Sequence, residues 1–184
     1  MNTRIGQVFR YSRAKKPEIS ELDGYANFHY VTHTQGLPFL QLERGINTPS
    51  KNGDIRPVIL IRSSPHKTGS DTTPWQDIFD PDLGHIRYYG DNKKPGTDPA
   101  KSPGNKALLE EFARHSDPTK RHLACPLVFF RGVPRQGRSK GFVEFNGFGI
   151  IHRAERITQY RPNGQTFSNY VFDFVVFGMT SEHE

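Results

Sequence analysis

The sequence has almost no cysteine chemistry. Cys125 is the only cysteine among 184 residues, so an intrachain disulfide and a cysteine-based metal cluster are excluded. It precedes an apolar stretch, and we expect a buried structural thiol in a reducing, cytoplasmic compartment. No apolar run approaches the roughly 18 residues needed to span a bilayer. Basic residues follow Met1 where a leader peptide would be apolar, so we expect no membrane partner.

The usual signatures of catalysis are also lacking. The chain has no glycine-rich phosphate-binding loop ending in Lys-Ser/Thr and no G-x-S-x-G motif. His29 and His33 are four residues apart, but no further ligands complete a zinc site. Three acids lie among turn residues, which favours a surface or capping role over a metal site: Asp77, Asp80 and Asp82. We therefore predict a binding module with no cofactor, no metal and no enzymatic activity.

Positive charge is concentrated in the middle of the chain. The net charge is +6 and the sequence pI is about 9.5. Residues 85–140 contain 12 lysines and arginines against 5 acids, whereas the rest of the chain contains 13 against 14. A localised positive field favours a polyanionic partner, most often nucleic acid, although a high pI alone is also common in other soluble proteins.

The hydrophobic pattern of the first two thirds predicts three strands and one helix. The strands are Tyr25–Val31, a weaker Leu37–Leu42, and Pro57–Ile61, which is apolar on both faces. The helix starts at Asn105, the expected N-cap, carries a favourable Glu110–Arg114 pair at i,i+4, and stops before Pro118.

The last third is dominated by strand patterns. Apolar or alternating segments occupy Pro126–Phe130 and begin again at Gly141, Phe148 and Ser168, and the turn Pro162–Gly164 predicts a hairpin. These elements indicate an α+β fold: a curved antiparallel sheet or partial barrel with one main packed helix and a few short helical turns. We expect one domain over residues 1–184, with residues 1–16 as a basic N-terminal arm.

The most unusual segment is the polar, basic stretch Arg62–Lys94. It follows the Pro57–Ile61 strand and contains hydroxyls, prolines and Trp75, the only tryptophan. It then reaches the aromatic-basic run His85–Tyr89. Aromatic rings beside cations suit a phosphate backbone and its bases. By itself, Trp75 is more often a core anchor than a platform for a base, and we expect it to pack beneath the loop.

These motifs resemble a known group of DNA-recognition modules. The arrangement R-S-S-P-x-K-x-G-S, T-P-W-x-D-x-F-D and G-H-I-R-Y-Y-G-D-N-K is similar to the sulfur-binding domain of McrA-like Type IV, modification-dependent restriction endonucleases. The AspBHI-type N-terminal recognition domain, which reads methylated cytosine, looks related. The resemblance covers about Tyr25–Phe130. It implies a cytoplasmic bacterial reader of double-stranded, phosphorothioate-modified DNA, with an HNH nuclease domain supplied in cis or in trans.

The resemblance also implies where the modified phosphate would bind. In the sulfur-binding domains a proline ring and neighbouring carbons form an apolar cup for sulfur, and Pro65 occupies the matching position. The family often has larger apolar groups where Ser64 and Thr68 stand. The segment that we expect to bind sulfur and phosphate comprises Arg62, Ser63, Ser64, Pro65, His66, Lys67, Thr68, Gly69 and Ser70.

Further DNA contacts are expected on two other segments. Arg87 and Tyr89 alternate on one strand face, so both can face DNA while Tyr88 packs inward. The resemblance adds His29 and Tyr30. The complete set of predicted DNA-binding residues outside the cup is His29, Tyr30, His85, Arg87, Tyr89, Lys93 and Lys94.

Two other functions remain open from the sequence. A reader of methylated cytosine would flip the base into an aromatic pocket, for which Tyr88, Tyr89 and Asp91 are candidates. A nuclease with an unrecognised active site is the second alternative. Binding of matched plain, phosphorothioate and methylated duplexes separates the two readers, and a divalent-metal cleavage assay detects a nuclease.

Overall fold

The computed structural model describes residues 3–70, 74–80 and 83–177. Its strands are β1 (Val8–Arg10), β2 (Glu21–Leu22), β3 (Tyr25–Asn27), β4 (Ile46–Asn47), β5 (Ile59–Ser63), β6 (Ile78–Asp80), β7 (His85–Tyr89), β8 (Leu127–Gly132), β9 (Phe142–Tyr160) and β10 (Thr166–Phe177). Its helices are α1 (Phe28–Thr34) and α2 (Pro103–Ser116), with short 3₁₀ turns η1 (Pro65–Lys67), η3 (Pro99–Lys101) and η4 (Arg121–Leu123). Among these described residues, no helix is long and apolar enough to cross a membrane.

The strands form one mixed sheet that branches at β9. The main path runs β2-β3-β1-β9-β10-β7-β6, and β8, β5 and β4 extend from β9 on a second branch. Most pairs are antiparallel, but β1 runs parallel to β3 and β5 runs parallel to β8. The α+β class and the curved sheet are confirmed, and the two parallel pairs are additions that the sequence pattern did not indicate.

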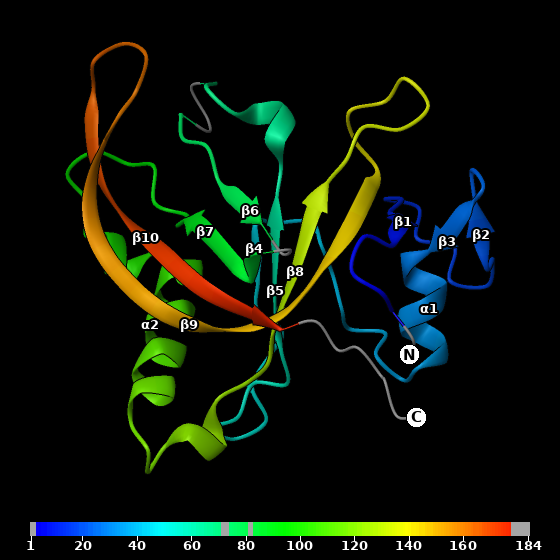
Figure 1. Cartoon of the computed structure of the whole chain (residues 1–184), viewed down its shortest axis with the longest axis horizontal. Coiled ribbons are helices and arrows are strands. Elements are labelled where there is room, and N and C mark those ends of the chain that lie inside the picture. Colours follow the sequence, from blue (N-terminus) through cyan, green and yellow to red (C-terminus); the bar gives the residue numbers. More distant parts are fainter. Residues whose placement is uncertain (1–2, 71–73, 81–82, 178–184) are drawn as a thin grey trace.

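The long β9–β10 hairpin bends strongly along its length (Figure 1). Gly147 has φ +104°, a conformation that other residues rarely adopt. At Gly149 an added Cβ would lie 2.3 Å from the carbonyl oxygen of Val175, so only glycine permits this close approach of the strands. A register shift between Asp173 and Phe174 adds to the bend. The bend lets one hairpin line the core at its base and project beyond it at its tip.

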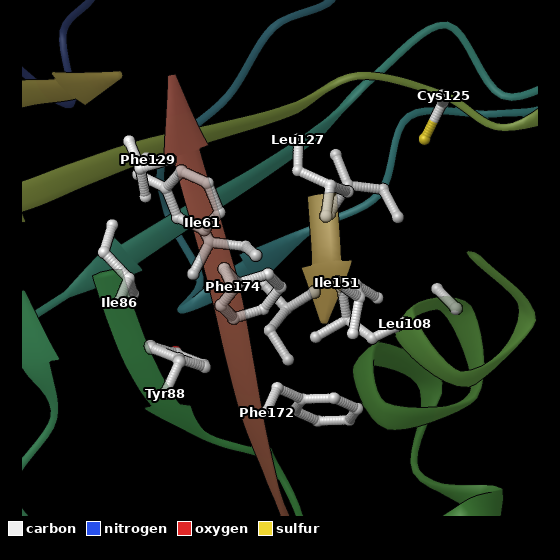
Figure 2. Packing of buried hydrophobic residues seen from close by; sticks show 14 residues of the cluster. Ile61, Ile86, Tyr88, Leu108, Cys125, Leu127, Phe129, Ile151, Phe172 and Phe174 are labelled. Atoms are coloured by element: carbon white, nitrogen blue, oxygen red, sulfur yellow. The ribbon is translucent and has the colours of Figure 1, made fainter. Parts of the chain in front are cut away.

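Two hydrophobic clusters lie on opposite sides of β5. Ile59 and Ile61 belong to a cluster with α2, β7 and β10, in which the rings of Phe129 and Phe174 lie 4.9 Å apart (Figure 2). Leu60 belongs to the second cluster, with β1 and α1. The prediction that this strand is apolar on both faces is therefore confirmed, and β5 joins the two clusters into one fold.

Cys125 and the helix α2 are tied together by a buried acid. Glu111 is fully buried, accepts a hydrogen bond from the backbone N–H of Cys125 at 2.9 Å, and pairs with Arg114 at 2.9 Å. Burial, followed by the nearby Glu111, raises the pKa of the Cys125 thiol to about 12, as expected of a structural thiol. The predicted Glu110–Arg114 pair is present at 3.1 Å.

The start of α2 differs from the prediction. The helix begins at Pro103, and Ser102 rather than Asn105 is the N-cap residue. The side chain that satisfies the first turn comes from a distant loop: Asp91 accepts hydrogen bonds from the backbone N–H groups of Gly104 and Asn105 at 2.8 and 3.0 Å. A cap supplied by tertiary structure leaves no local sequence signal.

Three predictions for the other elements are corrected. Tyr25–Val31 is not one strand, because the side chain of Asn27 accepts the N–H of His29 and starts α1 at Phe28. Leu37–Leu42 contains turns and no strand. The segments that begin at Gly141 and Phe148 form the single strand β9. Within the basic segment 1–16, Val8–Arg10 forms β1, which pairs with β9.

A buried amide network fixes the loop after β7. Asn169 donates to the carbonyl of Gly90 at 3.0 Å and to the side chain of Gln159 at 2.7 Å. Asn105 donates to the Oδ1 of Asn169 at 3.2 Å and accepts the N–H of Asp91 at 3.0 Å. The segment that follows Tyr89 is thereby held against β9, β10 and α2.

We predict that Asn169→Ala destabilises the fold by about 2–4 kcal/mol, because it leaves several buried polar groups without partners. Urea unfolding measures the change, and Thr158→Ala, on the exposed side of β9, is the matched control. Equal stability of the two variants would show that the network does not hold the loop.

Candidate nucleic-acid interface

The loop after β5 presents an exposed polar patch. Pro65, His66, Lys67, Thr68 and Gly69 are exposed, and Ser64 and Ser70 are partly exposed. The loop projects from the same edge of the molecule as the β8–β9 connection and the tip of the β9–β10 hairpin (Figure 1). Seven of the nine residues predicted to bind sulfur or phosphate therefore lie together on an accessible surface.

The other two predicted residues of this segment do not join the patch. Arg62 is half-buried beside Tyr11 and Tyr88, donates to the carbonyl of Glu43 at 3.4 Å, and has its pKa lowered by burial. Ser63 is 4% exposed. Both belong to strand β5 itself, whose side chains alternate between the two interior sides, so the prediction of direct phosphate contact is corrected for this pair.

Ser63 instead holds an acid at the edge of the patch. Its hydroxyl donates to Oδ2 of Asp77 at 2.9 Å, and the backbone N–H of Tyr89 donates to Oδ1 of the same carboxylate at 3.0 Å. Burial raises the pKa of Asp77 from 3.8 to about 6, and these two hydrogen bonds oppose that rise only in part. No cation of the described residues forms an ion pair with it. A largely desolvated, unpaired carboxylate at a surface edge is typical of a functional site.

Three aromatic rings lie together near the segment that carries Asp77. The rings of Trp75 and Tyr89 have centroids 6.3 Å apart at 32°, and Trp75 lies equally far from Phe167 at 59°. The ammonium of Lys93 is 5.7 Å from the centre of the Trp75 ring. Trp75 is partly exposed and belongs to neither hydrophobic cluster, so the prediction of a core anchor is wrong.

Strand β7 alternates as predicted, but its charges are already paired. Tyr88 is buried in the core (Figure 2). His85, Arg87 and Tyr89 alternate with the buried residues of the strand and are partly exposed. Arg87 donates to both carboxylate oxygens of Asp173 at 2.8 and 3.3 Å, and His85 contacts the same carboxylate at 3.1 Å. Because this pairing offsets the charge of Arg87, we expect a smaller contribution to phosphate binding than the sequence alone indicated.

The sequence suggested three residues for a base pocket, and the structure gives two of them other roles. Tyr88 points into the core, and its hydroxyl contacts the backbone of Arg62. Asp91 caps helix α2. Tyr89 is partly exposed, its ring lies next to that of Trp75, and its backbone N–H donates to Asp77. The sequence assigned Asp77 a surface or capping role, because nothing near it in the sequence shows its hydrogen bond to Ser63 at the end of β5.

The remaining predicted DNA-binding residues are dispersed. His29 is 1% exposed and packs against Tyr11, with a pKa lowered mainly by burial, so a direct DNA contact is corrected. Tyr30 is partly exposed on α1, and Lys94 is exposed beside Lys93. Burial and neighbouring positive charges, led by Lys67, lower the pKa of Lys93.

The β8–β9 connection adds cations that the predicted site did not include. Arg138 forms an ion pair with Asp23 at 3.2 Å, and Arg10 pairs with the same carboxylate at 2.7 Å. Lys140 is exposed, and with Lys67 it lowers the pKa of His66 after the effect of burial. The positive charge of this surface suits contact with phosphates.

Of the acids predicted to have a surface or capping role, Asp80 has that role, whereas Asp77 does not, because its carboxylate is largely desolvated. Asp80 accepts the backbone N–H of Leu83 at 3.3 Å in a turn, whereas Asp82 lies outside the described residues. Over residues 3–70, 74–80 and 83–177 no group of three acids, histidines or cysteines is placed to hold a metal ion.

Comparison with solved structures identifies the class of protein. The MspJI restriction endonuclease, solved in complex with a 27-mer oligonucleotide, superposes with a TM-score of 0.80 and 42% identity over 95% of this chain and 42% of its own. The DNA-recognition domain of the cytosine modification-dependent endonuclease LpnPI has the same fold (TM-score 0.69, 22% identity, 95% of this chain and 74% of that one). The modification-dependent endonuclease AspBHI does too (0.67, 18%, 96% and 76%). The chain therefore has the fold of a domain found in restriction endonucleases.

The family follows from the sequence match. The chain belongs to the family described as restriction endonuclease AspBHI N-terminal, whose model matches residues 5–181. The resemblance to modification-dependent restriction modules is therefore confirmed. The family description names the N-terminal part of a restriction endonuclease, and this chain spans less than half of the MspJI chain. A comparison with curated proteins finds no match.

We predict that Asp77→Asn stabilises the protein at neutral pH. The native pKa is raised, so the folded state disfavours the charged form, and stability is lost as pH rises from about 4 to about 6. The amide carries no charge and can accept from Tyr89 and donate to Ser63. A shift from 3.8 to about 6 sets an upper limit of about 3 kcal/mol.

Urea unfolding of both proteins from pH 4 to pH 8 tests this prediction. The stability difference should be largest above pH 6 and should vanish near pH 4. If the wild-type protein were more stable than the variant at pH 8, the charged Asp77 carboxylate would not destabilise the folded state.

Proposed function

We propose that this chain is a single domain that reads a modified cytosine in double-stranded DNA by turning the base out of the helix. The observation that supports this most is the partly buried Asp77 carboxylate, which forms no ion pair in the described chain. It accepts the N–H of Tyr89, whose partly exposed ring lies next to that of Trp75. A flipped base is read by stacking between flat side chains and by hydrogen bonds to its edge. An acid accepts hydrogen bonds from the exocyclic amino group of cytosine.

The distances suit such a base. A ring stacked between two others needs a gap of about 7 Å, since favourable carbon contacts are about 3.5 Å on each face. The centroids of Trp75 and Tyr89 are 6.3 Å apart, so a small outward movement of either ring admits a base. Both oxygens of Asp77 hold their present donors with only one lone pair each, and a carboxylate accepts about four hydrogen bonds.

The surrounding cations account for general DNA affinity. Lys67 and Lys93 form no ion pair within the described residues, and Lys94 and Lys140 are exposed. Lys93 lies over the Trp75 ring, and Lys67 is close enough to lower the pKa of Lys93. Their phosphate contacts would position the duplex, while the pocket would supply the preference for the modified base.

The relatives support cytosine as the base. LpnPI, which shares the fold, is described as cytosine modification-dependent. Cleavage in such systems would come from a nuclease domain in cis or in trans. If this chain alone cut the same duplexes with Mg²⁺, the proposal of a pure recognition module would be overturned, and the nuclease alternative would replace it.

We predict that Tyr89→Ala weakens binding of a duplex with 5-methylcytosine by about 1–3 kcal/mol, because one stacking partner is lost. The preference of the wild type over unmodified DNA should be at least about fourfold, the value of one buried methyl group. Gel shifts with plain, methylated and phosphorothioate duplexes of one sequence measure both quantities.

Tyr160→Ala is the control for this experiment. Tyr160 is 68% exposed at the end of β9, so its loss should leave the preference for the methylated duplex unchanged. Equal binding of methylated and plain duplexes by the wild-type protein would end the proposal.

Phosphorothioate DNA is a second candidate ligand, supported by the exposed ring of Pro65. The ring lies next to Gly132, where an added Cβ would lie 3.9 Å from Cδ of Pro65, and Lys67 adjoins it. An apolar carbon surface beside a cation suits a large, weakly hydrated anionic sulfur.

If sulfur binds there, Pro65→Asp should abolish a preference for phosphorothioate of about tenfold, worth about 1–2 kcal/mol. Lys67→Ala should weaken every duplex alike and reduce the log–log salt slope by about 0.9. A wild-type protein that binds phosphorothioate and plain duplexes equally would remove this candidate.

A further inference from the structure

Arg161 joins the tip of the β9–β10 hairpin to the loop after β7. It directly follows β9, and its backbone closes the turn by pairing with Gln165 at 2.8 Å. Its guanidinium donates to the carbonyl oxygen of Lys93 and, at 3.3 Å, to the side chain of Gln165. The predicted hairpin turn is therefore also the place where a distant loop is anchored.

The same guanidinium lies against the aromatic cluster. Its central carbon is 5.7 Å from the centre of the Phe167 ring, and Phe167 contacts Trp75 with centroids 6.3 Å apart. Lys93, whose backbone Arg161 holds, places its ammonium 5.7 Å from the centre of the Trp75 ring. Arg161 is thus connected to Trp75 in two ways. One runs through the ring of Phe167, and the other runs through the backbone and side chain of Lys93.

These contacts leave Arg161 poorly suited to bind phosphate itself. Two of its nitrogens donate within the protein, and its Nε is buried with no partner in the described part of the chain. It also stands close enough to Lys93 to help lower the pKa of that ammonium. Repulsion between these two neighbouring positive charges destabilises the fold. The presence of Arg161 at this position therefore suggests a role other than stability.

We propose that Arg161 is a positioning residue that couples the hairpin tip to the base pocket by holding Phe167 and the Lys93 loop around Trp75. The inference rests on the proposed function, because the pocket is the one described there. The hairpin tip projects from the body of the protein on the same edge as the other loops (Figure 1). Contact of the hairpin tip with DNA would then change the orientation of the Trp75 ring, on which the base stacks.

Trp75 makes this coupling directly measurable because it is the only tryptophan of the chain. In the free protein, Arg161→Ala should increase quenching of Trp75 fluorescence by acrylamide, since Phe167 and Lys93 are no longer held over the indole. Arg156→Ala, an exposed arginine on the same hairpin, removes the same charge and should leave the quenching unchanged. Equal quenching of wild type and Arg161→Ala would overturn the proposal.

Binding of methylated and plain duplexes forms the second arm. Arg161→Ala should reduce the preference for the methylated duplex by about tenfold, or to unity if the wild-type preference is smaller, a size typical of residues that act through their neighbours. Its effect on the plain duplex should match that of Arg156→Ala. Equal weakening of both duplexes beyond that control would identify Arg161 as an ordinary phosphate ligand and overturn the positioning role.

Arg161→Lys separates charge from geometry. Lysine keeps the charge but not the planar fork that contacts Phe167 and the Lys93 carbonyl together. It should bind plain DNA like the wild type and lose preference like Arg161→Ala, whereas full preference would overturn the proposal. Thermal unfolding confirms that each variant is folded. If the wild type shows no preference, the proposed function fails, and the quenching arm still decides whether the coupling exists.

Discussion

The pairing of β9 with three neighbours is the constraint on which the structure depends. Its first half pairs with β1 and β8, and its remaining length pairs with β10. Val143 and Phe145 enter one hydrophobic cluster, and Ile151 enters the other. One strand therefore sets the register of both branches of the sheet. Because the same strand runs on into the projecting hairpin, the packing of the core also fixes the direction in which the hairpin leaves it.

The interface combines unfavourable groups with a rigid support. A desolvated carboxylate at Asp77 and close positive charges at Lys93 and Arg161 would each weaken an isolated loop. Behind them, the buried amides of Asn105 and Asn169 and the cap from Asp91 hold the backbone in one conformation. Sites that bind a ligand often concentrate such local conflict, and the stability of the surrounding fold tolerates it.

Features encoded by neighbouring residues could be predicted from the sequence. Apolar side chains at consecutive positions indicated that β5 is buried on both sides, and alternation in His85–Tyr89 indicated which rings of β7 face outward. The turn Pro162–Gly164 marked the hairpin. The exposed loop with Pro65 and Lys67 was also found, because prolines, glycines and hydroxyls directly follow an apolar strand.

Features that depend on distant partners could not be predicted in this way. Arg87 meets Asp173 only because β7 and β10 pair, and nothing near either residue signals the contact. Trp75 was assigned to the core from its residue type, although its neighbours in space are Tyr89 and Phe167. The strand predicted over Tyr25–Val31 was wrong for a local reason as well. The capping side chain of Asn27 starts a helix in a segment whose pattern is typical of strands.

The hydrogen bond between Ser63 and Asp77 has a consequence for how such modules diversify. It joins the two ends of the segment 64–76 at 2.9 Å, at the points where that segment leaves β5 and approaches β6. A segment whose ends are clamped together can change in length and composition without altering the strands on either side, since loop closure costs little more as a loop grows. Substitutions between Ser63 and Asp77 can therefore change what this edge of the molecule binds while β5 and β6 stay in place.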